Sequence, residues 1–292
     1  MASSEKKENL VWDSEEFAKV YGSAEKLTGT FAQMLVEEAK LNQVSDAEEL
    51  VILDEACGTG IVSVKLMETL SDKAKENLDL TCADFADPMV DYVGKRIQSA
   101  GWKNAKAIQS DGCDTKLPSS QYTHIFLNFG PMVFPDHKAG LSEISRMLRP
   151  GGIIAMSSWE KIGWSPDVRA AFATDPELPP MPSDEEVAAL LSPGGKWNEP
   201  AWARDTVTQA GFEDVRVQSV PHTSLLDGVT ELMTLVTGVV AMLMSRIWSK
   251  EQQEKYNERA KVAVEKYMEQ KYRNSEIKWD WIAILITAKK PA

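Results

Sequence analysis

Residues 51–60 read VILDEACGTG, and they are the most informative residues of the chain about its architecture. An apolar run ends at Asp54 and enters a turn with Gly58 and Gly60, after which residues 61–70 are compatible with a helix. Glycine lets the backbone approach a ligand that a Cβ would block, and it adopts turn conformations closed to other residues. In an open parallel sheet, such a turn lies at the carboxyl end of a strand, where ligands bind. The stretch therefore predicts a buried first strand followed by a nucleotide-type cofactor site.

Two cofactors compete for this turn, and a tight turn that binds nothing is the remaining alternative. Nicotinamide dinucleotides bind a G-x-G-x-x-G pattern after a strand, but here Ser63 stands at the third glycine position. Asp54 lies four residues before the first glycine, where its charge would oppose a pyrophosphate and would suit an ammonium group. S-adenosylmethionine carries an ammonium, a sulfonium and an adenosine, and it has no phosphate. The acid therefore favours S-adenosylmethionine.

The order D-x-A-C-G-T-G at residues 54–60 resembles motif I of the class I S-adenosylmethionine-dependent methyltransferases. Two later acids fit that resemblance. In the family, an acid at the end of the second strand, here Asp84 after residues 78–83, accepts hydrogen bonds from both ribose hydroxyls. The alternative is that Asp84 or Asp87 caps the helix that follows. An acid after the third strand, here Asp111, contacts the adenine amino group in the family and is otherwise an ordinary turn residue.

The rest of the chain alternates strands with helices, which indicates a right-handed, doubly wound α/β fold. The strands expected after the first two are residues 105–109, 122–128, 153–158, 215–220 and 281–288. An L-R-P-G-G turn precedes the fifth strand and is a second feature of the methyltransferases. We therefore expect a mostly parallel, seven-stranded, Rossmann-like sheet of the class I methyltransferase kind, with an N-terminal helical lid and a helical cap insertion.

The expected organisation has four segments: a lid at residues 1–45, a cofactor-binding core at 46–160, an insertion over the active site at 161–200, and a final segment at 201–292. The lid should contain helices at about residues 14–20 and 24–40. Residues 166–200 are rich in proline and acid, which predicts an irregular segment. The final segment completes the core and carries a helical cap at about residues 228–275. The first cap helix is apolar on most sides and must be buried, whereas the second is charged and should face solvent.

A narrower resemblance rests on EKLTG at residues 25–29, the DEACGTG turn, YTHIFLNFG at residues 122–130 and SSW at residues 157–159. Together they look like fungal secondary-metabolite methyltransferases of the gliotoxin bis-thiomethyltransferase type. The resemblance implies S-methylation of a small dithiol, such as a reduced epidithiodioxopiperazine. The expected cofactor-binding residues are Tyr21, Thr28, Asp54, Ala56, Cys57, Gly58, Gly60, Asp84, Phe85, Asp111, Gly112 and Asn128. The expected substrate-binding residues are Phe129, Met132, Phe134, Trp159 and Trp164.

The acceptor atom determines whether a general base is needed. A thiol with a pKa of about 8.5 supplies some thiolate at neutral pH, whereas a hydroxyl needs a base within hydrogen-bond reach. Of the histidines His124, His137 and His222, His137 is the candidate base, with an ordinary surface loop residue as its alternative. O- or N-methylation of another small aromatic or apolar metabolite therefore stays open. A regulator that binds cofactor without turnover stays open as well.

Bulk properties restrict the partners. The net charge of -12 argues against nucleic acid, because phosphate binding needs clustered Lys and Arg. The first ten residues are too polar for a signal peptide, and no apolar run reaches the roughly 18 residues of a membrane span. The cysteines Cys57, Cys82 and Cys113 lack metal-site spacing. We expect a cytoplasmic enzyme with a small-molecule substrate and with no metal, no membrane and no obligate protein partner.

Overall fold

The computed structural model describes residues 21–226, 229–273 and 275–292. The helix expected at about residues 14–20 lies outside the described residues. The seven strands are β1 (Leu50–Glu55), β2 (Leu78–Asp84), β3 (Ala105–Gln109), β4 (Tyr122–Asn128), β5 (Leu148–Lys161), β6 (Glu213–Leu226) and β7 (Ile277–Lys289). They form one sheet in the order β3-β2-β1-β4-β5-β7-β6. The strands from β3 to β5 pair in parallel, and β7 runs antiparallel to both β5 and β6. The predicted doubly wound, mostly parallel seven-stranded sheet is confirmed.

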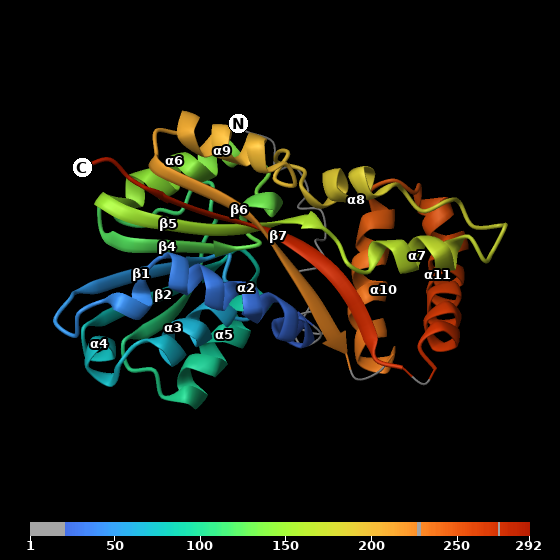
Figure 1. The fold of residues 1–292 in the computed structure, drawn as a ribbon, viewed down its shortest axis with the longest axis horizontal. Coiled ribbons are helices and arrows are strands. Elements are labelled where there is room, and N and C mark those ends of the chain that lie inside the picture. The colour runs from blue at the N-terminus through green and yellow to red at the C-terminus, as the bar shows by residue number, and fades with distance from the viewer. Residues whose placement is uncertain (1–20, 227–228, 274) are drawn as a thin grey trace, which may run out of the picture.

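Helices cover both faces of this sheet. The helices on one face are α2 (Glu25–Glu38), α3 (Ile61–Thr69), α4 (Asp72–Glu76) and α5 (Asp87–Ala100), and those on the other are α6 (His137–Met147) and α9 (Pro200–Gln209) (Figure 1). Every residue of β1 is buried, because a central parallel strand is covered on both sides. The ends of β1, β2, β3 and β4 therefore meet at one edge of a rigid sheet, where they can position a site.

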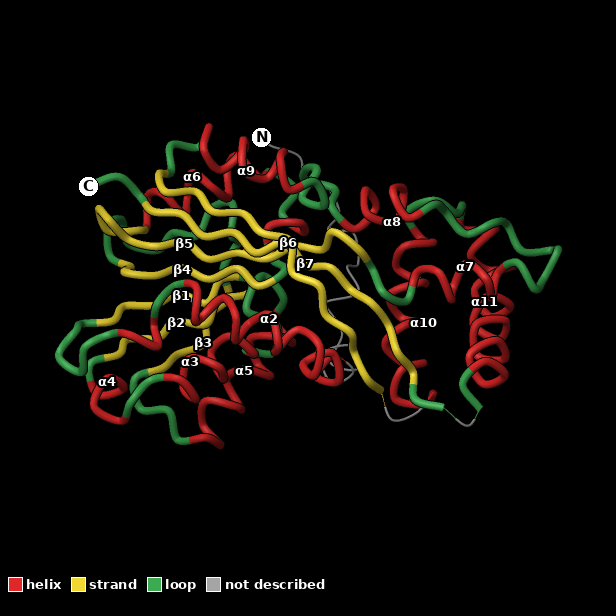
Figure 2. Tube along the Cα trace, in the orientation of Figure 1, coloured by secondary structure: helices red, strands yellow, loops and turns green. Residues whose placement is uncertain are grey.

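A second body of helices lies beyond that edge. It consists of α7 (Ser165–Phe172), α8 (Asp184–Leu191), α10 (Val229–Ser245) and α11 (Lys250–Lys271). The long strands β6 and β7 continue out of the main sheet alongside these helices (Figure 2). The predicted pair of helices between the last two strands is present, and its second member has a mainly exposed surface. This helical cap has its own apolar core, which includes Trp164, Phe172 and Trp248.

A buried carboxylate ties the cap together. Asp167 of α7 is buried, and its carboxylate accepts hydrogen bonds from Nζ of Lys271, the hydroxyl of Tyr272 and Nε1 of Trp279, the last at 2.9 Å. These donors come from the end of α11 and from β7. Hydrogen bonds to a charged group are stronger than neutral ones. The cap is thus joined to the end of the sheet by polar contacts as well as by apolar packing.

The structure differs from the sequence prediction in several elements. Residues 166–200 were expected to be irregular but contain α7 and α8, because Pro166 suits a first helical turn and Ser183 begins a capping box with Glu186. Strand β5 begins at Leu148, within the expected L-R-P-G-G turn. Strands β6 and β7 are longer than predicted, and the short helix α4 has no predicted counterpart. In the part of the chain that the structure describes, each helix is too short or too polar to cross a membrane.

Candidate active site

The glycine-rich turn after β1 has an unusual backbone. Ala56, Gly58 and Gly60 have φ values of 51°, 53° and 82°, a region that side chains with a Cβ rarely adopt. At Gly60, a Cβ would lie 2.5 Å from Cγ2 of Val93 on α5, closer than packed carbon atoms approach. Glycine is therefore required there by both conformation and space, and it lets α3 begin directly against α5.

Asp84, at the end of β2, faces this turn. Its Oδ2 accepts a hydrogen bond of 2.8 Å from the backbone N–H of Gly58, and its Oδ1 accepts one of 3.0 Å from Ala86. Burial raises the pKa of Asp84, while these hydrogen bonds oppose the rise. Helix α5 has Ala86 as its N-cap, without a side-chain cap. The carboxylate is thus held between the ends of β1 and β2, where its remaining lone pairs can meet a ligand's hydroxyl groups.

Asp54 takes a different position from the one that the sequence predicts. Its Oδ2 accepts hydrogen bonds from the backbone N–H of Ser63 at 3.1 Å and from Oγ of Ser63 at 2.7 Å. Desolvation raises the pKa of Asp54 to about 7. Because neighbouring strand residues point to opposite faces, Asp54 is directed at α3 whereas Glu55 lines the cavity described next. Asp54 therefore fixes the start of α3 and does not reach the cavity wall.

A cavity of about 320 Å³ opens where these strands end. The predicted site residues that line it are Tyr21, Ala56, Gly58, Asp84, Phe85, Asp111, Gly112, Asn128, Phe129 and Phe134. The lining also includes residues that the sequence analysis did not single out for the site, namely Glu55, Ala86, Met89, Ser110, Cys113, Gly130, Val133, Pro135 and Arg246. For Glu55 a sequence signal was available, since it is an acid within an otherwise apolar strand. For Arg246 no sequence signal was available, because it lies far along the chain and comes to the cavity only when the chain folds.

The other four predicted cofactor residues do not line the cavity. Thr28 is buried, with its hydroxyl donating to the carbonyl of Ala24 at 3.1 Å. Cys57 and Gly60 belong to the turn and Asp54 to the end of β1, and these three residues do not line the cavity. These residues hold the backbone of the site in place from outside the cavity.

Three of the residues expected to bind the substrate lie outside the lining of this cavity. Met132, Trp159 and Trp164 do not line the cavity. Met132 belongs to the main core and Trp164 to the core of the cap. Trp159 stacks behind Phe129 with ring centroids 3.9 Å apart. Large apolar side chains gain most from such packing, and this explains why they are withdrawn from the cavity.

His137 also lies away from the cavity. It starts α6, and its Nδ1 donates to the backbone carbonyl of Gly194. The rings of Trp197 and Trp202 lie edge-on to its imidazole, with centroids at 6.4 Å and 5.2 Å. Its contacts in this structure are those of a residue that holds α6 to the segment before α9. The position gives no support to the predicted role as a base.

The wall that follows β4 is held by a short polar chain. Oγ of Ser157 donates to Oδ1 of Asn128 at 2.7 Å and accepts from the backbone N–H of Phe129 at 2.9 Å. Phe129 has a φ of 58°, so its backbone needs such support. Ser157 and Trp159 both come from β5, and they fix the side chain that faces the cavity.

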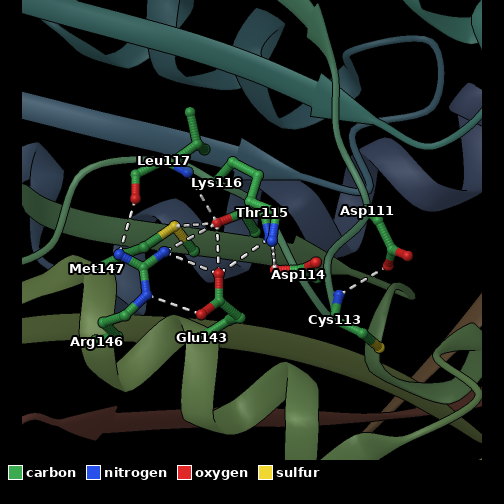
Figure 3. Close-up of polar contacts among 9 residues, drawn as sticks. All are labelled: Asp111, Cys113, Asp114, Thr115, Lys116, Leu117, Glu143, Arg146 and Met147. Carbon is green, nitrogen blue, oxygen red and sulfur yellow. Dashed lines mark hydrogen bonds and ion pairs between the residues drawn. The ribbon is translucent and has the colours of Figure 1, made fainter.

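The loop after β3 forms another wall and is fixed to α6 (Figure 3). The backbone N–H and hydroxyl of Thr115 donate to Oε2 of Glu143 at 2.9 and 2.6 Å. Arg146 donates to both oxygens of Glu143 and to the carbonyl of Leu117. The hydrogen bond from Arg146 is the largest cause that lowers the pKa of Glu143 to about 2. This charged cluster holds the loop that carries Asp111.

Helix α2 is joined to the glycine-rich turn through α5. Arg96 of α5 donates to both carboxylate oxygens of Glu25 on α2, at 2.9 and 3.0 Å. It also donates to the carbonyl of Thr59 at 2.8 Å. A bidentate pair has a fixed geometry, so α2, α5 and the glycine-rich turn keep a defined arrangement.

Comparison with known proteins identifies the family. Residues 52–152 match the family model described as a methyltransferase domain. The chain is 34% identical to the methyltransferase tpcH of Aspergillus fumigatus, over 96% of this chain and 99% of the relative. It is 38% identical to the acetylaranotin bis-thiomethyltransferase of Aspergillus terreus, over 95% of this chain and 96% of the relative. Among solved structures, a similar one is phosphoethanolamine N-methyltransferase 2 of Haemonchus contortus in complex with S-adenosyl-L-methionine, with a TM-score of 0.52 at 13% identity. The match covers 89% of this chain and 52% of that one, and it shows the fold.

The chain therefore belongs to the class I S-adenosylmethionine-dependent methyltransferases, and it is an enzyme of that class. Within the class, it groups with fungal enzymes of the gliotoxin bis-thiomethyltransferase type, as the sequence resemblance predicts. Its cofactor is S-adenosyl-L-methionine.

The cavity fits this cofactor. Glu55, Asp84 and Asp111 give the lining an acidic side that suits a cationic ligand rich in N–H and O–H donors. Oε2 of Glu55 and Oγ of Ser110 are buried and have no hydrogen-bond partner among the described residues. Buried polar atoms normally have partners. These acceptors are therefore suited to the ammonium, hydroxyl and amino groups of the cofactor.

Proposed function

We propose that this methyltransferase acts on thiols of a small apolar metabolite, a reduced dithiol diketopiperazine. The observation that carries the proposal is the 38% identity to an acetylaranotin bis-thiomethyltransferase across nearly the whole of both chains. The proposal concerns the acceptor atom and the substrate class, because the family alone leaves both open. Methylation of a hydroxyl or an amine is the competing hypothesis.

The positions of the histidines support a thiol acceptor. His124 is buried in β4, where its Nδ1 lies 3.0 Å from Oγ1 of Thr123, and burial lowers its pKa to about 4. His137 is bonded to a backbone carbonyl, and His222 packs against Phe31 with centroids 5.6 Å apart. Each histidine is therefore engaged in a structural contact. A thiol requires no strong base, since part of it is already thiolate at neutral pH.

The remaining walls suit the proposed substrate. Phe129, Val133, Phe134 and Pro135 give the cavity an apolar side, which favours a compact, apolar molecule. The cofactor, when bound, supplies a methyl group on a sulfonium sulfur that a thiolate can displace in line. The residues of the chain then have to align the acceptor and exclude water, and alignment alone accounts for much of the rate in such reactions.

One basic residue of the lining fits thiol chemistry as well. Arg246 follows α10, and its Nη1 donates to the carbonyl of Leu190 in α8. Arg246 lines the cavity from the side of the helical cap. A nearby positive charge lowers the pKa of a thiol and raises the thiolate fraction.

The test compares matched acceptors. Purified protein is incubated with S-adenosylmethionine and either a reduced dithiol diketopiperazine or its diol counterpart, and release of S-adenosylhomocysteine is measured. We expect turnover with the dithiol only, and the same rate in the His137→Ala variant. Turnover of the diol that disappears in His137→Ala would replace the thiol acceptor by a hydroxyl. Tight binding of S-adenosylhomocysteine without turnover of any acceptor would favour a regulator.

A further inference from the structure

Glu55 is the last residue of β1 and interrupts an otherwise apolar strand. Glu55 is 1% exposed and lines the cofactor cavity. Its Oε2 has no hydrogen-bond partner among the described residues. Asp54 next to it is equally buried but has Ser63 as a partner. The two adjacent acids therefore differ: Asp54 is satisfied within the protein, whereas Glu55 lines the cavity and has a buried oxygen without a partner among the described residues.

The surroundings of Glu55 make its carboxyl costly for folding. Burial raises the pKa of Glu55 well above its usual value, and the nearby Asp84, Asp54 and Asp111 add to the rise. A hydrogen bond from the backbone N–H of Ala56 acts in the opposite direction. No ion pair to Glu55 exists among the described residues. An apolar side chain at this place would pack against the same core without the desolvation cost.

Ser110 repeats the pattern on the other side of β2. It directly follows β3, and its backbone N–H donates to the carbonyl of Asp84 at 2.9 Å. Its side chain is buried and lines the same cavity, and its Oγ also lacks a partner among the described residues. Two unsatisfied polar groups on one cavity, from different strands, point to a ligand that satisfies both.

We infer that Glu55 and Ser110 bind the cofactor directly, with the Glu55 carboxyl accepting a hydrogen bond from an N–H group of the ligand. The inference rests on cofactor binding and does not depend on the acceptor proposed above. S-adenosylmethionine and S-adenosylhomocysteine share two such groups, the amino group of the amino-acid part and the exocyclic amino group of adenine. Either group can donate an N–H hydrogen bond to the carboxyl of Glu55, whose Oε2 has no other donor among the described residues.

The experiment uses Glu55→Met, which keeps the length of the side chain and removes the acceptor, and Glu55→Gln, which keeps an acceptor and removes the charge. Binding of S-adenosylhomocysteine is measured by calorimetry, and thermal unfolding is followed with and without the ligand. Thr81→Val is the matched control, because Thr81 is buried in β2 and does not line the cavity. We expect ligand-free Glu55→Met to be at least as stable as the wild type. Its affinity for S-adenosylhomocysteine should fall by about tenfold or more, the usual scale for a lost bond to a charged group.

Adenosine, which lacks the amino-acid part, separates the two N–H sources. If Glu55→Met weakens adenosine as much as S-adenosylhomocysteine, the carboxyl contacts the adenine amino group. If adenosine binding is unchanged, the contact is with the amino-acid end. Wild-type affinity for S-adenosylhomocysteine in both Glu55 variants would overturn the inference about Glu55 and would leave the cofactor assignment intact. Absence of binding in the wild-type protein would overturn the cofactor assignment and the inference with it.

Discussion

Replacing Gly60 by alanine tests whether the turn after β1 is shaped by steric necessity. Gly60 has a φ of 82°, and the new Cβ would lie 2.5 Å from Cγ2 of Val93. Val93 is fully buried, and a β-branched side chain in a helix has one strongly preferred rotamer. The valine therefore cannot swing aside, and α3 or α5 must shift.

The expected cost has two parts. Left-handed backbone geometry costs an alanine about 1–2 kcal/mol, and forcing extra volume into a packed interior costs about 1–3 kcal/mol. Together they predict a loss of about 2–5 kcal/mol in the free energy of unfolding. Gly101 is the matched control, because it has a φ of 67° and a Cβ added there would meet no atom within 4 Å. Gly101→Ala should therefore show the backbone cost of about 1–2 kcal/mol and nothing more.

Urea unfolding of the wild type and both variants measures these differences, provided that the slope of the transition stays constant. Binding of S-adenosylhomocysteine should also weaken in Gly60→Ala, since a shift of α3 displaces the turn, and it should be unchanged in Gly101→Ala. Equal stability of the two variants would refute the packing argument at Gly60.

Three further predictions follow from other contacts. Asp84→Ala should weaken binding of S-adenosylhomocysteine by about tenfold or more while the protein stays folded, and wild-type affinity by calorimetry would remove Asp84 from the site. Trp159→Ala removes a partly buried ring that is stacked on Phe129 and should cost about 2–3 kcal/mol in urea unfolding; a cost under about 0.5 kcal/mol, the scale of a surface change, would contradict its packing role. Glu143 has a pKa of about 2 when folded and about 4.3 when unfolded, so its stabilising effect is present above about pH 4.3 and is lost as the pH falls toward 2. The stability difference between the wild type and Glu143→Gln should therefore close over that interval in urea midpoints, and a difference independent of pH would count against the ion pair with Arg146.

The cofactor half of the site was predictable because its signals are local. The strand, the glycine-rich turn and the acid Asp84 lie within a short stretch of sequence, and glycines at positive φ leave a direct trace in the residue pattern. Asp54 shows the limit of this reasoning. The pattern indicated an acid at the turn, but only the alternation of β1 decides that Asp54 faces α3 and Glu55 faces the cavity.

The sequence signals for the acceptor half are less specific, because aromatic side chains give the same pattern in the wall of a site as in a core. Trp159 lies within β5 and Trp164 follows it, and both side chains pack against apolar clusters. Phe129 and Phe134 do line the cavity. Arg246 comes from the helical cap, and its position in the lining of the cavity depends on how the cap packs against the core, which no short sequence pattern specifies.

The most direct test of the account is to identify the methylated atom. The protein is incubated with S-adenosylmethionine that carries a trideuterated methyl group and with a reduced dithiol diketopiperazine, and the products are analysed by mass spectrometry with fragmentation. The account predicts a labelled thioether on sulfur, with loss of the corresponding free thiol. Unchanged dithiol in protein that binds S-adenosylhomocysteine, or label on oxygen or nitrogen, would contradict it.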